Sequence, residues 1–181
     1  MKIVPRAFQL PNGELLTVRS LCAEDAEALE VFRCATYSET HFMARYPEDG
    51  ASLEEMQKGL AGSEASALNF EVGAFAGEKL VGEFGVAQVR PHIKCRHRAV
   101  MGISVRKKYW GCGLGSYLMQ LAIDQTRTNG FEQLELGVCS DNTRAIHLYE
   151  KFGFERCGTM PHAFKLKDGT YRDEIMMVKM L

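Results

Sequence analysis

Three glycines in one short loop, Gly111, Gly113 and Gly115, have the spacing that points most directly to chemistry. A strand-like run at residues 100–105 precedes them, and an amphipathic helical pattern at residues 117–122 follows. Glycine adopts backbone angles that other residues avoid and lets a ligand approach the main chain closely. The unpaired N–H groups at the start of a helix commonly bind phosphate. The segment therefore predicts a cradle for a phosphate-bearing ligand.

Two common phosphate-binding loops fit this segment poorly. A P-loop needs Lys followed by Ser or Thr after its last glycine, whereas Ser116 and Tyr117 stand there. A dinucleotide-binding loop fits at Gly111 and Gly113 but not at Ser116. The loop also lies beyond the middle of the chain, which leaves too little sequence for the repeated βαβ units of a dinucleotide fold. This second alternative is disfavoured, and a binding measurement with NAD would test it.

The stretch from residue 100 to residue 154 resembles the acetyl-CoA motif of the GCN5-related N-acetyltransferase (GNAT) superfamily. The resemblance rests on a hydrophobic strand ending in Ile-Ser-Val at residues 103–105 and on the glycine loop at residues 110–115. It also rests on an Asn-x-x-Ala-x-x-x-Tyr-x-x-x-Gly-Phe segment at residues 142–154, which matches in full. Trp110 stands where the loop usually begins with Gln or Arg, although Tyr-Trp-Gly is similar to bacterial members.

The resemblance implies which residues bind the cosubstrate, acetyl-CoA. The strand would pair with the pantetheine arm, the loop would hold the pyrophosphate, and the asparagine would contact CoA. Asn142 also suits a helix cap, because it precedes a helical segment that ends near Gly153, and the two roles are compatible. The implied cofactor-binding residues are Ile103, Ser104, Val105, Trp110, Gly111, Cys112, Gly113, Leu114, Gly115, Ser116, Asn142 and Tyr149.

Tyr149 is the expected general acid, because a tyrosine at this position of the family motif reaches the sulfur of CoA. A phenol with a reference pKa near 10 can protonate a departing thiolate; the alternative is a tyrosine that only packs in the helix. The general base stays open between His97 and Glu83, the latter acting through a water. Either could be an exposed structural residue, and some family members use only a chain of waters.

Cys112 and Cys139 raise the alternative of an acetyl-cysteine intermediate. No histidine or lysine is placed by the sequence to activate either thiol. The family usually transfers the acetyl group directly within a ternary complex, and we expect the same here.

The implied activity is transfer of an acetyl group from acetyl-CoA to a primary amine, with a small amine or an amino acid as the expected acceptor. The alternatives are a ribosomal-protein-type N-terminal acetyltransferase and a catalytically inactive CoA-binding sensor. Asp173 and Glu174 could bind an amine cation or simply lie on a strand face. Acetyl-CoA and the amine are the expected partners, without nucleic acid, membrane or metal, and a homodimer is left open.

The surrounding pattern predicts the elements that position these residues. Serine at position 52 and glutamate at position 55 form a capping box, which indicates the start of a helix. The fold class is α/β (α+β), a single domain over residues 1–181 with a central mixed, mostly antiparallel sheet flanked by helices. The predicted strands are residues 15–21, a hairpin at 69–76 and 79–90, and two closing strands at 155–166 and 171–181.

Two groups of side chains near the predicted site have open roles. Arg106, Lys107 and Lys108 sit beside the glycine loop and could neutralise CoA phosphates, whereas the basic loop at residues 90–98 is expected to be solvated. Five residues could touch the acceptor, although aromatic side chains are more often part of the core: Phe32, Tyr37, His41, Phe42 and Tyr46.

Composition indicates an ordinary soluble domain. The 181 residues are 46% hydrophobic and 25% charged, with a formal net charge of −1, which implies no general attraction to nucleic acid or membrane. No apolar run approaches the ~20 residues of a membrane span. The six cysteines lack any Cys-x-x-Cys pair, which argues against a zinc site and a disulfide scaffold. The expected location is the cytoplasm.

Overall fold

One eight-stranded sheet organises the molecule, in the strand order β1-β2-β3-β4-β5-β6-β8-β7. The computed structural model describes residues 3–181. Neighbouring strands are antiparallel except β5 and β6, which are parallel. This confirms the predicted mixed, mostly antiparallel sheet. The strands are β1 Arg6–Gln9, β2 Leu15–Ser20, β3 Phe70–Ala76, β4 Lys79–Gln88, β5 Arg98–Val105, β6 Gln133–Cys139, β7 Glu155–Lys165 and β8 Tyr171–Met180.

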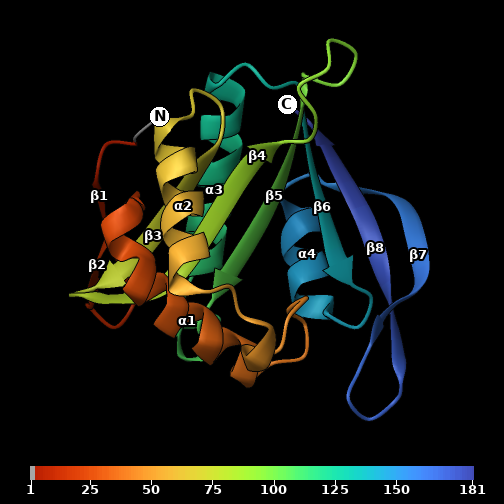
Figure 1. The fold of residues 1–181 in the computed structure, drawn as a ribbon, viewed down its shortest axis with the longest axis horizontal. Helices are drawn as coiled ribbons and strands as arrows, with labels where there is room; N and C mark the ends of the chain where they lie inside the picture. Colours follow the sequence, from red (N-terminus) through yellow and green to blue (C-terminus); the bar gives the residue numbers. More distant parts are fainter. Residues whose placement is uncertain (1–2) are drawn as a thin grey trace.

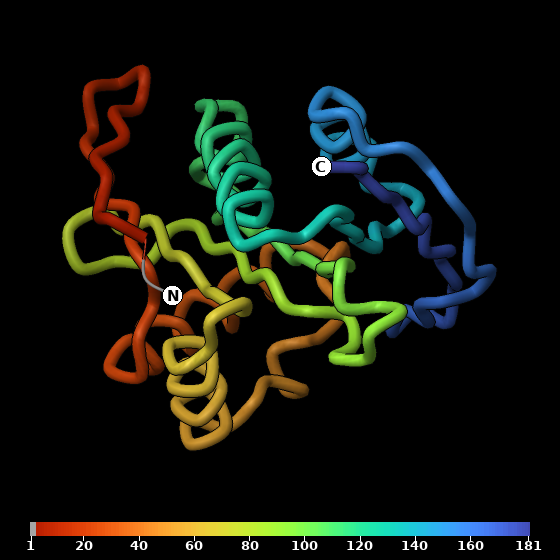
Figure 2. Tube along the Cα trace, turned by 90° about the horizontal axis from the view of Figure 1, so that it is seen from above, coloured from red at the N-terminus to blue at the C-terminus, as the bar shows by residue number. Residues whose placement is uncertain are grey.

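Within residues 3–181, four α-helices cover the two faces of this sheet. They are α1 Ala26–Glu39, α2 Leu53–Ala65, α3 Leu114–Thr128 and α4 Thr143–Lys151. Figure 2 shows α3 and α4 above the sheet and α1 and α2 below it. The larger core cluster lies between the sheet and α3 and α4. A smaller one, around Leu29, Phe32 and Leu60, packs α1 and α2 against the other face.

Local sequence signals explain several of these elements. The capping box is present: the Ser52 hydroxyl accepts the Glu55 N–H at 3.3 Å, and the Glu55 carboxylate accepts the Ser52 N–H at 2.8 Å. The hairpin of β3 and β4 turns at Gly77, whose φ is 60°. In α3 the predicted apolar positions Leu118, Leu121 and Ala122 recur at helical spacing and are buried. These predictions are confirmed.

The structure adds features that the sequence did not predict. β1 pairs with β2 at the edge of the sheet. β5 begins at Arg98, inside the loop that we expected to be solvated, and Arg98 forms an ion pair with Glu135. At the opposite edge β7 is exposed along nearly its whole length and forms a bent ribbon with β8 (Figure 1). Across residues 3–181, every helix is too short or too polar to cross a membrane.

Candidate active site

The middle of the sheet opens between β5 and β6. The two strands pair over three residues each, from Arg98 opposite Gln133 to Val100 opposite Glu135. Beyond these pairs they diverge, as Figure 1 shows. A cavity of about 570 Å³ lies at the divergence, with walls from α1, β3, β4, β5, β6, α4 and β8. An extended ligand can therefore reach the centre of the sheet.

The predicted glycine loop joins the end of β5 to the start of α3. Gly111 and Gly113 have φ angles of 75° and 89°, in the region that favours glycine. α3 begins at Leu114 without a side-chain cap from the described residues, so the N–H groups of its first turn can bind an anion. A Cβ at Gly111 would meet nothing within 4 Å, so the main chain is accessible there. These features fit a pyrophosphate group.

Trp110 attaches this loop to the strand before it. Its indole Nε1 donates to the carbonyl of Val105 at 2.7 Å. The guanidinium of Arg144 lies over the indole ring, 4.3 Å from the centroid. Arg144 belongs to α4, so this stacking connects the glycine loop to the second motif. The residue that departs from the family pattern thus has a structural role.

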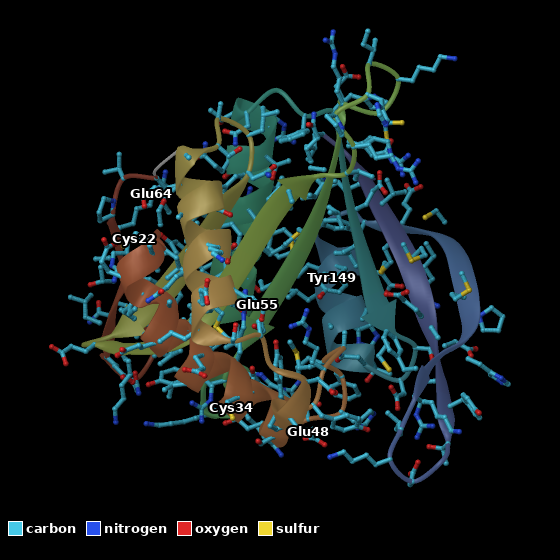
Figure 3. All side chains as sticks on the ribbon, in the orientation of Figure 1. Cys22, Cys34, Glu48, Glu55, Glu64 and Tyr149 are labelled. Atoms are coloured by element: carbon cyan, nitrogen blue, oxygen red, sulfur yellow. The ribbon has the colours of Figure 1, made fainter. Side chains whose placement is uncertain are left out.

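α4 brings the two named residues of the second motif to the cavity. The Asn142 side chain caps the helix by accepting the Ala145 N–H at 3.2 Å, and it also lines the cavity. Tyr149 lies on the next turns of α4, facing the sheet (Figure 3), and is 7% exposed. Within residues 3–181 its hydroxyl has no hydrogen-bond partner, and it is open to the cavity. Burial raises the pKa of Tyr149 to about 12, so the phenol retains a proton that it can donate.

Glu83 reaches the same cavity from β4. It is 8% exposed, lies opposite Ser104 of β5, and accepts the Ser104 hydroxyl at 3.3 Å. Ile103 and Ser104 line the cavity, and Val105 continues toward the glycine loop. The structure therefore places the predicted strand residues and one predicted base candidate around one space.

Arg33 and Glu71 are further site residues, which the sequence analysis missed. Arg33 of α1 donates to both carboxylate oxygens of Glu83, from Nε at 3.0 Å and Nη2 at 3.1 Å, and approaches Glu71 at 3.5 Å. Burial raises the pKa of Glu71. A signal was present in the sequence, because Glu71 and Glu83 each interrupt an otherwise apolar strand. Charges at such positions indicate buried partners.

His97, the other predicted base candidate, is not brought to this site. It precedes β5, at the opposite end of the strand from Ser104. Its carbonyl accepts the N–H groups of Glu132 at 2.9 Å and Gln133 at 3.3 Å, so its position supports the parallel pairing of β5 and β6. The described residues that line the cavity do not include it. Only Glu83 of the two candidates faces the space beside Tyr149.

The five aromatic candidates near the acceptor have different positions. Phe32 is 1% exposed and belongs to the core of α1 and α2. Tyr37 and Phe42 line the cavity. The Tyr46 hydroxyl accepts the N–H of Lys167 in the β7–β8 turn at 3.0 Å, so it links two loops. Two of these residues are thus in reach of an acceptor.

Residues 40–49, which we call the strap, lie beside the cavity between α1 and α2. His41 belongs to the strap, and its Nε2 lies 2.9 Å from Oδ2 of Asp141, which follows β6. Arg172 of β8 donates to the same oxygen at 2.7 Å. Although partial burial opposes it, hydrogen bonds from Cys139, His41 and Arg172 lower the pKa of Asp141 to about 2. The Asp141 carboxylate therefore joins the strap to β6 and β8.

The two cysteines near the site are poor nucleophiles. Burial and the hydrogen bond to Asp141 raise the pKa of the Cys139 thiol to about 11, so the thiolate is scarce at neutral pH. The Cys112 thiol donates to the carbonyl of Tyr109 at 2.8 Å. This geometry favours direct transfer over an acetyl-cysteine intermediate.

The basic run before the glycine loop is only partly available to phosphate. Arg106 is committed to Glu39, with its Nε 2.9 Å from Oε1. Lys107 and Lys108 are exposed in the short turn between β5 and the loop. These two lysines are the members of the run that could meet CoA phosphates.

The sequence from residue 27 to residue 154 matches the model of the Acetyltransferase (GNAT) family. This match covers more than half of the chain. The chain belongs to the GNAT family. The resemblance drawn from the two motifs is confirmed.

GNAT proteins of known structure share this fold. An acetyltransferase of the GNAT family from Streptococcus pneumoniae superimposes with a TM-score of 0.86 at 28% identity, covering 92% of this chain and 99% of that one. A structure from Salmonella typhimurium, solved with its cofactor acetyl-CoA, has a TM-score of 0.79 at 20% identity, covering 92% and 94%. The second likeness shows the fold alone.

Among curated relatives, spermidine N(1)-acetyltransferase of Escherichia coli strain K12 is 37% identical over 81 residues. That alignment covers 44% of this chain and 43% of the relative. The chain spans less than half the length of the first curated relatives it matches.

Proposed function

We propose that this protein transfers an acetyl group from acetyl-CoA to the primary amine of a small molecule, by direct transfer in a ternary complex. The observation that carries the proposal is the position of Tyr149. Its hydroxyl, without a hydrogen-bond partner in residues 3–181, opens into the cavity at the divergence of β5 and β6, which Glu83 also lines. An acid and a base thus share the space where a thioester would sit.

The two faces of the sheet separate the two substrates. The glycine loop, the α3 N-terminus and Asn142 lie on the side of α3 and α4, and they fit CoA. Arg33, Tyr37 and Glu71 lie on the side of α1 and α2, where an acceptor amine would enter.

Each residue then has a chemical role. The thioester of bound acetyl-CoA supplies the acetyl group. Glu83, through a water, accepts a proton from the ammonium so that the nitrogen lone pair can form the new C–N bond. A backbone N–H at Ile103 or Ser104 polarises the carbonyl oxygen. Tyr149 donates its proton to the sulfur as the C–S bond breaks, the nitrogen loses its second proton through water to restore the phenol, and the products are an acetamide and the CoA thiol.

The test is thiol release from acetyl-CoA with a panel of primary amines, amino acids, polyamines, aminoglycosides and peptides with free N-termini. Amine-dependent release is expected, together with a higher melting temperature in acetyl-CoA. Release with peptides alone would instead support N-terminal acetylation. Stabilisation by acetyl-CoA without release for any amine would support the inactive sensor, and absence of stabilisation would contradict the proposal.

A further inference from the structure

The charges that line the cavity are unbalanced. Three carboxylates, from Glu71, Glu83 and Glu174, face one guanidinium, from Arg33. Arg33 is already committed: it donates twice to Glu83 and lies 3.5 Å from Glu71. The Glu71 carboxylate also accepts the Ser63 hydroxyl at 3.1 Å. The remaining carboxylate, Glu174, has no hydrogen-bond or ion-pair partner among residues 3–181.

Strand register places Glu174 on the same face of the sheet as Glu83. Glu83 lies opposite Ser104 of β5. Ser104 is four residues after Val100, so both point to the same face, and Val100 lies opposite Glu135 of β6. Two further alternations along β6 lead to Cys139, which lies opposite Glu174 of β8. Because side chains alternate between faces, all of these residues point to the side of α1 and α2. This is the side on which the acceptor would enter.

The backbone of β6 makes room for the Glu174 side chain. A Cβ at Gly137 would collide with Oε1 of Glu174, so the carboxylate lies directly over this glycine. Gly137 belongs to the part of β6 that has diverged from β5. Glu174 therefore reaches from β8 across β6 toward the opening, rather than away into solvent.

A second observation indicates that a ligand completes this cavity. Tyr149 is only 7% exposed, and its hydroxyl, which is open to the cavity, lacks a partner within residues 3–181. A polar group in such a position can take its hydrogen-bond partner from a ligand. The reacting end of a ligand is therefore expected near Tyr149 and Glu83. The carboxylate of Glu174, which has no cationic partner among residues 3–181, lies on another side of the same cavity.

We propose that the acceptor carries a second cationic group, which Glu174 binds, and lacks a carboxylate, so that the acceptor class is the aliphatic diamines and polyamines. Glu174 is then a specificity-determining residue. A free carboxylate on the acceptor would meet Glu71 and Glu174 while the lining guanidinium is committed to Glu83. This inference rests on the proposed acetyl transfer to an amine and names its substrate class.

Three amines of matched length test the inference: 1,5-diaminopentane, pentylamine, which lacks the second amine, and lysine, which adds a carboxylate. A hydrogen bond to a charged group contributes about 10- to 100-fold in affinity. We expect kcat/KM for the diamine to exceed those for pentylamine and lysine by at least about 10-fold. A kcat/KM for pentylamine or for lysine that equals the value for the diamine would overturn the proposal.

The variant Glu174→Gln keeps the side-chain shape and removes the charge. We expect it to raise KM for the diamine by about 10-fold or more, with kcat little changed, and to reduce the preference over pentylamine. Glu155→Gln is the matched control, because Glu155 is an exposed carboxylate on the adjacent β7 that does not line the cavity. An unchanged diamine-to-pentylamine ratio in Glu174→Gln would overturn the proposal.

A binding measurement separates this inference from the proposed function. Titration of 1,5-diaminopentane into the CoA complex should release heat in the wild type and much less in Glu174→Gln. Turnover of other amines without this preference means that the transferase assignment is right and the acceptor class is wrong. Lack of turnover with every amine, including diamines of three to eight carbons and spermidine, overturns both.

Discussion

Arg33 of α1 and Glu83 of β4 are joined by two hydrogen bonds, of 3.0 and 3.1 Å, across fifty residues of sequence. This pairing fixes the Glu83 carboxylate beside the Ser104 hydroxyl. Glu83 is only 8% exposed there. Since both oxygens already accept from the same guanidinium, the carboxylate has one orientation toward the cavity. The Glu83 carboxylate is therefore expected to accept a proton that a water molecule brings to it, without a change in its own side-chain conformation.

The first prediction concerns Glu83→Gln. The amide can still accept from Arg33 but cannot take a proton, so we expect kcat/KM at neutral pH to fall by about 100-fold. The loss should diminish as rising pH deprotonates the free amine. The control is His97→Ala, at the other end of β5, which should stay within a few-fold of wild type. A larger loss in His97→Ala than in Glu83→Gln would reverse the assignment of the base.

The second prediction concerns Tyr149→Phe. Removal of the hydroxyl leaves the ring packed beside Phe154, 6.0 Å between centroids, so the melting temperature should change little. We expect kcat to fall by about 10²- to 10⁴-fold, because the departing thiolate loses its proton donor. The dissociation constant of acetyl-CoA, measured by calorimetry, should stay within a few-fold. Unchanged turnover would show that this tyrosine only packs.

The third prediction compares two glycines with similar backbones. Gly111 and Gly130 have φ angles of 75° and 82°, and a Cβ at either would meet nothing within 4 Å. Gly111→Ala and Gly130→Ala should therefore each lower the free energy of unfolding by about 1–2 kcal/mol. Gly111→Ala alone should also reduce the thermal stabilisation by acetyl-CoA. Equal stabilisation of the two variants would mean that the loop does not bind the pyrophosphate.

The fourth prediction concerns the strap and pH. The pKa of Asp141 is lowered to about 2, so its stabilising contacts are fully present above about pH 4 and are lost as pH falls toward 2. Asp141→Asn should destabilise the protein by roughly 1 kcal/mol or less at pH 7, since the pair is partly exposed. The difference in melting temperature between variant and wild type should shrink below pH 4. Asp124→Asn, at an exposed position of α3, should show no such convergence.

Sequence was sufficient where site residues are close together along the chain. The strand, the glycine loop and Tyr149 fall within about fifty residues, and the resemblance to the family motifs pointed to each one. The contact between Arg33 and Glu83 depends on how α1 packs against β4, which no local pattern encodes. His97 lies at the end of β5 away from the cavity, and counting along a strand does not show which of its ends reaches a cavity. β1 is four residues long and lacks a fully buried face, so alternation gave no signal.

The divergence of β5 and β6 has a consequence for how the molecule presents its backbone. Outer edges of a sheet expose unpaired N–H and C=O groups and invite other chains to pair with them. Here the divergence creates such an edge inside the sheet, bounded on both sides by strands of the same chain. A narrow ligand with amide groups can pair there as a strand would. The divergence thus offers the recognition capacity of a sheet edge at the centre of the sheet, between two strands of the same chain.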